Sequence, residues 1–472
     1  MDDSGDGRVT GRRLPAPLLL VSVLLFGALA IADAYWPGLM TWDAVRQYGQ
    51  ALDGDFDDWH PPAMGWLWRQ LLPFGSGPAP MLVVQLGLYW GGFAGIAGWA
   101  LRERRPMLAG ALAACAFLPL ALALMGAVLK DCLMAATLLS ATGLLLWTGD
   151  APGRIALRLV AVVLLLFAAA LRFNALPACL PLLVMLAPAQ FRDRPSRLLV
   201  VGLVATLALV AALPLANRAL GAKPSGVALS LVIFDLGGIT EHSGVNVFPA
   251  MDVANPVAVN HRCYTPVKWD SYSFWVDPVC PLGFEPFQAV VASGVNPYRL
   301  WLSAILTHPI AYAEHRLAHF NINTRFLVHD EIERPVQVES APNDWRYVVH
   351  PSGLLRTIDS LATASAATPL GWPIVWIALA LGSLLAGAGL ESRRITVPLA
   401  LSSLLYGLGY GVFSVASELR YHLWTMLAAL IATVLVMADT AAQPVPRWRQ
   451  LAAPYAPAVL VTMLATAWRV LP

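Results

Sequence analysis

Charged side chains are scarce in this chain. Of its 472 residues only 13% are Asp, Glu, Lys or Arg, whereas a soluble domain usually carries about 25%. Hydrophobic residues make up 58% and the mean hydropathy is +0.62, which together indicate a polytopic membrane protein. The net charge is only +2, so the chain lacks the broad basic field typical of nucleic-acid binding, and we expect no nucleic-acid partner.

Cysteine is also rare, and none of the five cysteines is arranged as a zinc site or a redox motif. Cys115, Cys132 and Cys179 fall in or beside hydrophobic runs, where a thiol behaves as a small buried hydrophobe. Cys263 and Cys280 share one long polar segment. They could be two free thiols, or a disulfide if that segment faces an oxidising compartment.

Sequence motifs for nucleotide phosphates and for zinc proteases are missing as well. Gly237-Gly238 follows an apolar run but lacks the Gly-x-x-x-x-Gly-Lys-Ser/Thr pattern of a phosphate loop. His315 and His319 are four residues apart but do not form a His-Glu-x-x-His motif. The chain also has no strict internal repeat and no low-complexity tract.

What the sequence does contain is a series of apolar runs of about 20 residues, the length that crosses a bilayer as a helix. They predict an all-α polytopic membrane protein with about eleven transmembrane helices. The first run is long for a signal peptide and lacks a clean cleavage site, so we expect it to remain as a span. The predicted spans are Leu14–Ala34, Pro80–Leu101, Met107–Val128, Leu133–Trp147, Ala156–Leu171, Ala175–Ala187, Leu198–Ala216, Pro369–Leu390, Ile395–Val415, Tyr421–Ala438 and Ala453–Val470.

Basic residues alternate between successive connections, and this alternation predicts the orientation. By the positive-inside rule the Arg-rich connections are cytoplasmic and the poorly basic ones face outward. We therefore expect a cytoplasmic N-terminus and an outward-facing first loop. The Arg-rich connections carry Arg8, Arg12 and Arg13; Arg102, Arg104 and Arg105; Arg154 and Arg158; Arg192, Arg194 and Arg197; Arg393 and Arg394; and Arg447 and Arg449.

The predicted spans divide the chain into three parts. Residues 1–216 form an N-terminal transmembrane module whose first outward loop is 35–79, residues 217–368 a large extracytoplasmic insert, and residues 369–472 the C-terminal transmembrane helices. Within the first loop, Pro61–Phe74 has the pattern of an amphipathic helix that lies on the membrane interface.

The most polar stretch of the chain follows the first span. It begins with Asp43 and Gln47 and ends with Asp58, Trp59 and His60 before two prolines. One interpretation is a solvated loop, with acids that keep it in water and Pro and Gly that make its turns. The other is a site for a charged substrate, because the prolines hold a stiff His beside clustered acids. If residues 43–52 are helical, Asp43 and Gln47 share one face.

Lys130, Arg172 and Arg420 are the only basic residues in the later short outward connections. Each could simply mark the membrane interface, as a snorkelling side chain does. Because ionisable residues near a membrane are costly, their gathering on one side favours a shared anionic ligand such as a phosphate. The neighbours that we expect in this binding site are Asp131, Asn174, Glu418 and Tyr421.

These motifs together resemble the C-type fold of integral-membrane glycosyltransferases, which includes the aminoarabinose transferase and the protein O-mannosyltransferases. The first outward loop is also similar to that of uncharacterised bacterial membrane proteins grouped near this fold. In the superfamily a first-loop acid is catalytic, an interfacial helix follows, and outer-loop basic residues hold a polyprenyl-phosphate sugar. The matching elements here are Trp42-Asp43, Pro61–Phe74, Lys130-Asp131, Arg172-Phe173-Asn174 and Glu418-Leu419-Arg420-Tyr421.

The resemblance implies an enzyme of the bacterial inner membrane that moves a sugar from a polyprenyl-phosphate donor to an extracytoplasmic glycan, lipid or protein. Asp43 would be the general base, with Asp58 or His60 positioning the acceptor, and Gln47 and Trp59 would bind substrate. Some members use a metal at an Asp-x-Asp, which occurs here only as Asp53-Gly-Asp55 and Asp55-Phe-Asp57, so a divalent metal remains possible and no other cofactor is expected.

Two other classes of function remain open from the sequence. A transporter or lipid flippase would need charged or broken helices at mid-membrane and matching halves, and the polar residues here gather at one face instead. A non-catalytic partner in polysaccharide assembly or export would use the insert as its binding module. Loss of activity on changing Asp43 alone would separate an enzyme from both.

Overall fold

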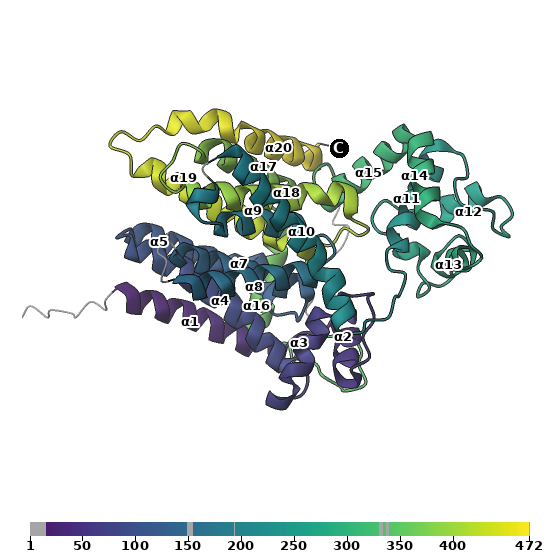
Figure 1. The fold of residues 1–472 in the computed structure, drawn as a ribbon, viewed down its shortest axis with the longest axis horizontal. Helices are drawn as coiled ribbons and strands as arrows, with labels where there is room; N and C mark the ends of the chain where they lie inside the picture. Colours follow the sequence, from purple (N-terminus) through teal and green to yellow (C-terminus); the bar gives the residue numbers. More distant parts are fainter. Residues whose placement is uncertain (1–15, 149–153, 193, 330–333, 337–338, 472) are drawn as a thin grey trace, which may run out of the picture.

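The structure is a computed structural model that describes residues 16–148, 154–192, 194–329, 334–336 and 339–471. This part of the chain is helical, with isolated β-bridges but no strand. Long helices lie side by side in a bundle, and a smaller helical unit extends from one end of it (Figure 1). The connection Arg8–Arg13 and the start of the first predicted span at Leu14 lie outside the described residues.

Each predicted span except Met107–Val128 coincides with one apolar helix, as expected of a polytopic membrane protein. Seven of the described helices are long and apolar enough to cross a membrane alone. They are α1 (Ala16–Tyr35), α4 (Ala79–Arg102), α7 (Lys130–Thr148), α10 (Pro195–Ala219), α18 (Arg393–Phe413), η7 with α19 (Leu419–Ala441) and η8 with α20 (Trp448–Val470). Three shorter apolar helices are α8 (Ile155–Leu171), α9 (Leu176–Leu186) and α17 (Pro373–Gly387). The number of crossings and the orientation stay predictions.

The span expected at Met107–Val128 is broken rather than continuous. Its first half, α5 with η2 (Pro106–Phe117), and its second half, α6 (Pro119–Met125), meet at an angle of 55°. The break falls at Leu118, whose φ of −57° and ψ of 118° are not helical. The cause is Pro119, because proline disfavours the helical conformation in the residue before it.

The chain beyond α6 is joined to the loop that follows α1. Leu39 donates its N–H to the Gly126 carbonyl at 3.1 Å and accepts from the Val128 N–H at 2.9 Å. Gly126 lies against the ring of Tyr35, where an added Cβ would be 2.2 Å from the ring. This close contact brings the start of α7 next to the first loop.

Two helices follow in the first loop, α2 (Trp42–Asp53) and α3 (Ala63–Leu71), the second continuing into η1 (Leu72–Phe74). The structure thus contains the amphipathic helix expected at Pro61–Phe74. Its inner face buries Met64 and Trp68, while Trp66 and Phe74 are exposed. Tyr48 of α2 packs against Trp68 with 5.0 Å between ring centroids, which holds the two helices together.

The insert has a hydrophobic core of its own, which extends from Leu229 to Ala311. Its elements are α11 (Leu229–Ser243), α12 (Pro256–Cys263), η5 (Trp269–Tyr272), α13 (Phe284–Ala292), α14 (Pro297–Thr307) and α15 (Pro309–Asn323). Cys263 and Cys280 are joined by a disulfide with an S–S distance of 2.04 Å.

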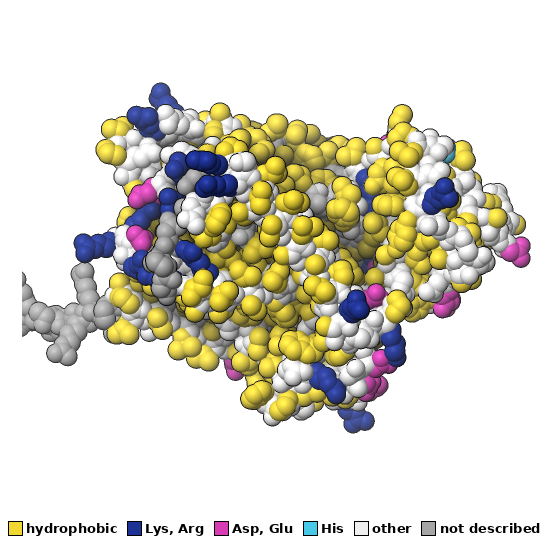
Figure 2. All heavy atoms as spheres, viewed as in Figure 1, with side chains coloured by type: hydrophobic (Ala, Val, Ile, Leu, Met, Phe, Trp, Pro, Cys, Tyr) yellow, Lys and Arg dark blue, Asp and Glu magenta, His cyan; other side chains and the backbone are white. Residues whose placement is uncertain are grey.

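The later part of residues 217–368 packs differently. Helix α16 (Gly353–Ala366) lies against α6 and α1, and its Leu355 and Ile358 belong to the core of the bundle. The separate unit is therefore shorter than the predicted insert. On the face shown in Figure 2, hydrophobic side chains cover the middle of the bundle, and Lys and Arg gather at the end away from the insert.

Candidate functional site

Asp43 lies in the first turn of α2, close to the bundle. The helix begins there because the Thr41 hydroxyl caps it, accepting the Ala44 N–H at 3.3 Å. A carboxylate in the first turn is stabilised by the partial positive charge of the helix N-terminus. The Asp43 side chain is 22% exposed, so it is reachable by a ligand while remaining shielded from bulk water.

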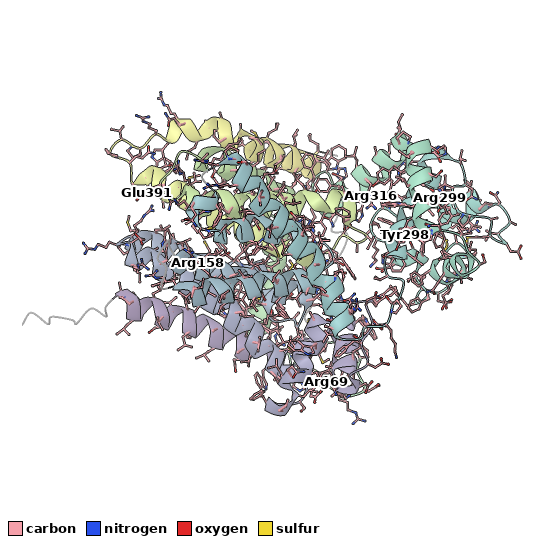
Figure 3. All side chains as sticks on the ribbon, viewed as in Figure 1. Arg69, Arg158, Tyr298, Arg299, Arg316 and Glu391 are labelled. Atoms are coloured by element: carbon pink, nitrogen blue, oxygen red, sulfur yellow. A yellow bond between two sulfur atoms is a disulfide. The ribbon has the colours of Figure 1, made fainter. Side chains whose placement is uncertain are left out.

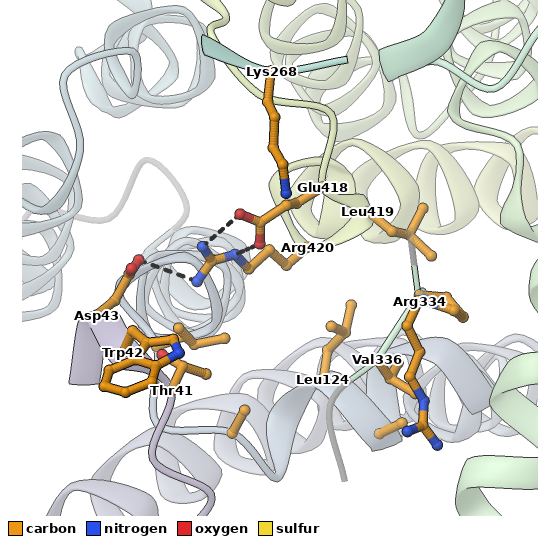
Figure 4. Close-up of a pocket in the computed structure, with 14 residues that line it drawn as sticks. Thr41, Trp42, Asp43, Leu124, Lys268, Arg334, Val336, Glu418, Leu419 and Arg420 are labelled. Atoms are coloured by element: carbon orange, nitrogen blue, oxygen red, sulfur yellow. Dashed lines mark hydrogen bonds and ion pairs between the residues drawn. The ribbon is translucent and has the colours of Figure 1, made fainter. Parts of the chain in front are cut away.

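The Asp43 carboxylate contacts two cations from distant parts of the chain. Its Oδ2 lies 3.2 Å from Lys130 Nζ. The same oxygen lies 3.2 Å from Arg420 Nη1 (Figure 4). Burial by itself raises the pKa of the Asp43 carboxyl, but the charges of Lys130 and Arg420 outweigh burial and hold the pKa well below its ordinary value. Asp43 is therefore ionised at every physiological pH.

His60 completes this cluster from the other end of the first loop. Its Nδ1 lies 2.6 Å from Lys130 Nζ, and its Nε2 lies 3.8 Å from Asp43 Oδ1. Burial, and then the charge of Lys130, lower the pKa of His60 to about 3. A neutral imidazole accepts a hydrogen bond from Lys130 through Nδ1, so its proton is on Nε2 and points toward Asp43.

Arg172 is the third cation, and three neighbouring side chains hold it at the cavity. It forms an ion pair with the buried Asp131, and its Nε donates to Asn174 Oδ1 at 3.2 Å. Its guanidinium also lies over the ring of Tyr421, 4.5 Å from the centroid. The structure thus holds Arg172 in one orientation with its planar fork fixed.

The cluster is close to electrical balance. Arg420 binds Glu418 as well as Asp43, with Nη2 3.0 Å from Glu418 Oε1. Three cations (Lys130, Arg172 and Arg420) face three carboxylates (Asp43, Asp131 and Glu418), while His60 is neutral. An anion that enters must therefore displace a carboxylate from its cation.

Two cavities, each of about 420 Å³, meet at this cluster. We name the one with more lining residues the aromatic cavity, because its walls include the three cations and four tryptophans, Trp59, Trp269, Trp275 and Trp301. The other, the Trp42 cavity, is lined by Trp42, by small apolar residues of α6 and by Lys268 of the insert (Figure 4). Asp43, Glu418 and Arg420 line both cavities and so form the wall between them.

Most residues predicted for the site line the aromatic cavity. They are Asp43, Trp59, His60, Lys130, Arg172, Asn174, Glu418, Arg420 and Tyr421. Asp131 lies behind them as the partner of Arg172. The fold thus brings together side chains that are far apart in the sequence, the most distant being Asp43 and Tyr421.

Besides Asp131, two predicted residues, Asp58 and Gln47, line neither cavity. The Asp58 carboxylate accepts from the Ser225 N–H and hydroxyl, both at 2.6 Å, and so fixes the chain where it enters the insert. Gln47 is buried and donates to the Asp43 carbonyl at 3.1 Å, one turn along α2. Both side chains are occupied in supporting the backbone around the site.

Several residues that line the aromatic cavity were not predicted from the sequence. Tyr410 lies in α18, and its hydroxyl donates to the Tyr421 carbonyl at 2.9 Å. Trp269 and Trp301 come from the insert, and Trp59 packs within 6.1 Å of Trp269, centroid to centroid. A lone Tyr in an apolar run and Trp in a long loop carry no spacing signal, so only the folded chain reveals them.

The described residues of this site do not form a set of ligands suited to a divalent cation. Among the described residues there is no group of three or more His, Cys, Asp and Glu side chains that could hold a metal. Two of the three Asp-x-Asp acids form ion pairs elsewhere, since Asp55 binds Lys223 at 2.6 Å and Asp57 binds Arg46 at 2.5 Å. Asp43 itself already faces two cations, which would repel a metal ion.

Comparison with known proteins gives structural neighbours only. No model of a known protein family and no curated protein sequence matches the chain. The fold is similar to solved structures of an oligosaccharyltransferase from Archaeoglobus fulgidus. In its complex with an inhibitory peptide and a dolichol-phosphate, the TM-score is 0.39, the identity 13%, and the match covers 96% of this chain and 56% of that one.

Two further structures of that protein give similar values. The complex with zinc and sulfate has a TM-score of 0.34 at 13% identity, covering 95% of this chain and 53% of that one. The form tethered to an acceptor peptide has a TM-score of 0.34 at 13% identity, covering 96% and 55%. This chain thus spans about half the length of these neighbours.

Proposed function

We propose that this protein is a membrane glycosyltransferase that moves a sugar from a polyprenyl-phosphate donor to an acceptor outside the cytoplasm. The observation that carries this proposal is the convergence of Lys130, Arg172 and Arg420 on a cavity whose other walls are largely aromatic and aliphatic. A phosphate suits the cations, since Arg offers a planar fork and Lys a point charge. An isoprenoid chain and a sugar ring suit the Trp-lined walls.

The transfer step follows from the position of Asp43. The acceptor oxygen or nitrogen forms a bond to the anomeric carbon of the sugar as the bond from that carbon to the phosphate oxygen breaks. The bonding electron pair leaves with the polyprenyl phosphate, whose developing charge Lys130, Arg172 and Arg420 stabilise. Asp43 takes the proton that the acceptor loses.

Asp43 is a weak base while Lys130 and Arg420 both contact its carboxylate, because their charges lower its proton affinity. A donor phosphate that draws Lys130 and Arg420 toward itself removes this restraint. The base then becomes stronger in the complex that needs it. His60, with Nε2 toward Asp43, is placed to orient an acceptor hydroxyl or amine.

The acceptor can reach Asp43 from the Trp42 cavity, since Asp43 lines both cavities. Donor and acceptor then approach from opposite sides of the wall formed by Asp43, Glu418 and Arg420. Trp42 is 67% exposed and offers a flat apolar surface at this side. The acceptor in this proposal is a glycan, a lipid or a protein.

The site would face the periplasm of a bacterial inner membrane. The Arg-rich connections lie on predicted cytoplasmic loops, and the insert and α2 lie at the other end of the bundle (Figures 1 and 2). Single cysteines test this orientation. A cysteine at position 55 should react with an impermeant reagent in intact cells, and one at position 104 only after the membrane is permeabilised. The reverse pattern would reject the orientation.

Binding of a polyprenyl monophosphate to the purified protein tests the function. Lys130→Met, Arg172→Gln and Arg420→Gln each remove a charge-assisted contact, so we expect each to weaken binding by about 10- to 100-fold. Lys223→Gln is the matched control, because Lys223 is an exposed cation near the first loop, paired with Asp55, and lines neither cavity.

Transfer of a labelled sugar from a polyprenyl-phosphate donor to a membrane extract separates an enzyme from the alternatives. Wild-type protein should label an acceptor, and Asp43→Asn should not, with both proteins equally abundant. Lipid binding without any transfer would favour a flippase or transporter. Failure of the wild-type protein to bind the lipid phosphate would refute the proposal.

A further inference from the structure

The segment 414–417 joins α18 to η7 and directly precedes Glu418 and Arg420. Its position therefore decides where these two side chains lie in the cavity wall. Ser414 and Ser417 are buried, at 3% and 5% exposure, so the segment is packed rather than loose. Its polar contacts come from the insert on two sides.

The first side is the stretch of the insert that leads into η5. The Trp269 N–H donates to the Val415 carbonyl at 2.8 Å, and the Ser417 hydroxyl donates to the Val267 carbonyl at 2.6 Å. Lys268 and Ala416 form an antiparallel bridge between these two bonds. The insert thus adds a short β-like pairing to a segment of the bundle.

The second side is α15. Arg316 Nη1 donates to the Ser414 carbonyl at 2.7 Å, and Asn323 Nδ2 donates to the Ala416 carbonyl at 2.9 Å. Asn323 Oδ1 is also 2.6 Å from Nε2 of His422, two residues after Arg420. Asn323 is 1% exposed and holds the chain both before and after Arg420.

The same network reaches the wall of the aromatic cavity. The buried Asp235 of α11 neutralises Arg316 at 2.5 Å and accepts from Trp301 Nε1 at 2.8 Å. Trp301 lines the aromatic cavity, and Arg316 lies where the insert meets the bundle (Figure 3). One carboxylate therefore ties a cavity-wall side chain to the residue that holds Ser414.

We propose that Asn323 and Arg316 are positioning residues, which fix Glu418 and Arg420 at the cavity through the segment 414–417. The insert then completes the anion-binding site and is not a separable acceptor-binding module. This inference rests on the proposed function, since it takes a lipid phosphate as the anion that Arg420 contacts.

Asn323→Asp tests the inference while keeping the shape of the side chain. It removes the donor to Ala416 and sets a carboxylate against that carbonyl oxygen, but keeps an acceptor for His422. We expect binding of a polyprenyl monophosphate to weaken by about tenfold. The matched control is Asn321→Asp, on the same helix, whose amide bonds only Leu327 in the chain that the structure describes. It should bind as the wild-type protein does.

Ser417→Ala is a second, milder variant that removes only the bond to Val267. It should weaken binding by about two- to fivefold with an unchanged melting temperature, and it decides the matter if Asn323→Asp does not fold. Folded Asn323→Asp with wild-type affinity, an equal loss in Asn321→Asp, or unaltered affinity in Ser417→Ala would each overturn the inference. Lack of lipid binding by the wild-type protein would instead reject the proposed function, and the positioning role with it.

Discussion

Asp43 and a donor phosphate would bind the same two cations, so replacing Asp43 by Asn should strengthen donor binding while it stops transfer. In the structure Lys130 and Arg420 are both 3.2 Å from Asp43 Oδ2. A phosphate that enters the aromatic cavity must compete with this carboxylate. Asn keeps the size of the side chain and removes its charge, so the competition ends.

The magnitude follows from the ion pairs. At an effective dielectric constant of about 20, two unit charges about 4 Å apart attract by about 4 kcal/mol. In the wild-type protein, displacing Asp43 costs this attraction. The phosphate recovers most of it through its own contacts with the cations, while Glu418 still holds part of Arg420. Asp43→Asn removes the part that is not recovered, so we expect donor binding to gain about 1.4 kcal/mol, which is a tenfold lower Kd for the lipid phosphate. Loss of the base should lower turnover by about 10²- to 10⁴-fold.

The assay measures the Kd of a polyprenyl monophosphate and the rate of sugar transfer on the same preparations. Asp55→Asn is the matched control, because Asp55 is in the same loop but pairs with the exposed Lys223 outside both cavities. It should change neither quantity. Donor binding that is equal or weaker in Asp43→Asn would refute the competition, and near-normal transfer would remove Asp43 as the base.

Three further predictions concern neighbouring features. Arg420→Lys keeps the charge but loses the planar guanidinium that reaches both Asp43 and Glu418, so donor binding should weaken, and it should weaken further in Arg420→Ala. Equal donor affinity in the wild-type protein and both variants would exclude Arg420 from the site. His60 has a pKa of about 3 in the folded protein against about 6.5 in the unfolded chain, so its contribution to stability is present above pH 6.5 and is lost as pH falls toward 3, by about 1.4 kcal/mol per pH unit. The melting temperature should therefore depend less steeply on pH between pH 7 and 4 in His60→Gln than in the wild-type protein. An equal slope in the two proteins would contradict the burial argument. Peptide mass spectrometry without reduction should recover Cys263 linked to Cys280, whereas alkylation of both thiols in unreduced protein would exclude the bond.

Residue type alone was enough to predict the helical membrane class and the segments that form apolar helices. Apolar runs near 20 residues leave the backbone no alternative to a helix in lipid, so the predicted segments and the apolar helices coincide. The break at Leu118 was missed, although Pro119 marks it, because hydropathy averages over a window and ignores the effect of one proline on the residue before it.

The basic and acidic residues of the site were likewise visible in the sequence, because charge is rare in this chain and costly near a membrane. Pairing was not visible. Asp58 and Asp43 are both acids of the first loop, yet Asp58 accepts a hydrogen bond from Ser225 whereas Asp43 forms ion pairs with the cations. That difference depends on the Leu39 and Gly126 contact, which sets the first loop against α7.

The sequence by itself determined that this is a helical membrane protein with scarce charges gathered in a few connections, since both properties follow from residue type and run length. Only the tertiary structure decided that Lys130, Arg172 and Arg420 meet at the aromatic cavity, that Trp301 joins its wall, and that α15 holds the segment before Arg420. These contacts join residues that are far apart in the sequence, and no local pattern encodes which helix ends will meet.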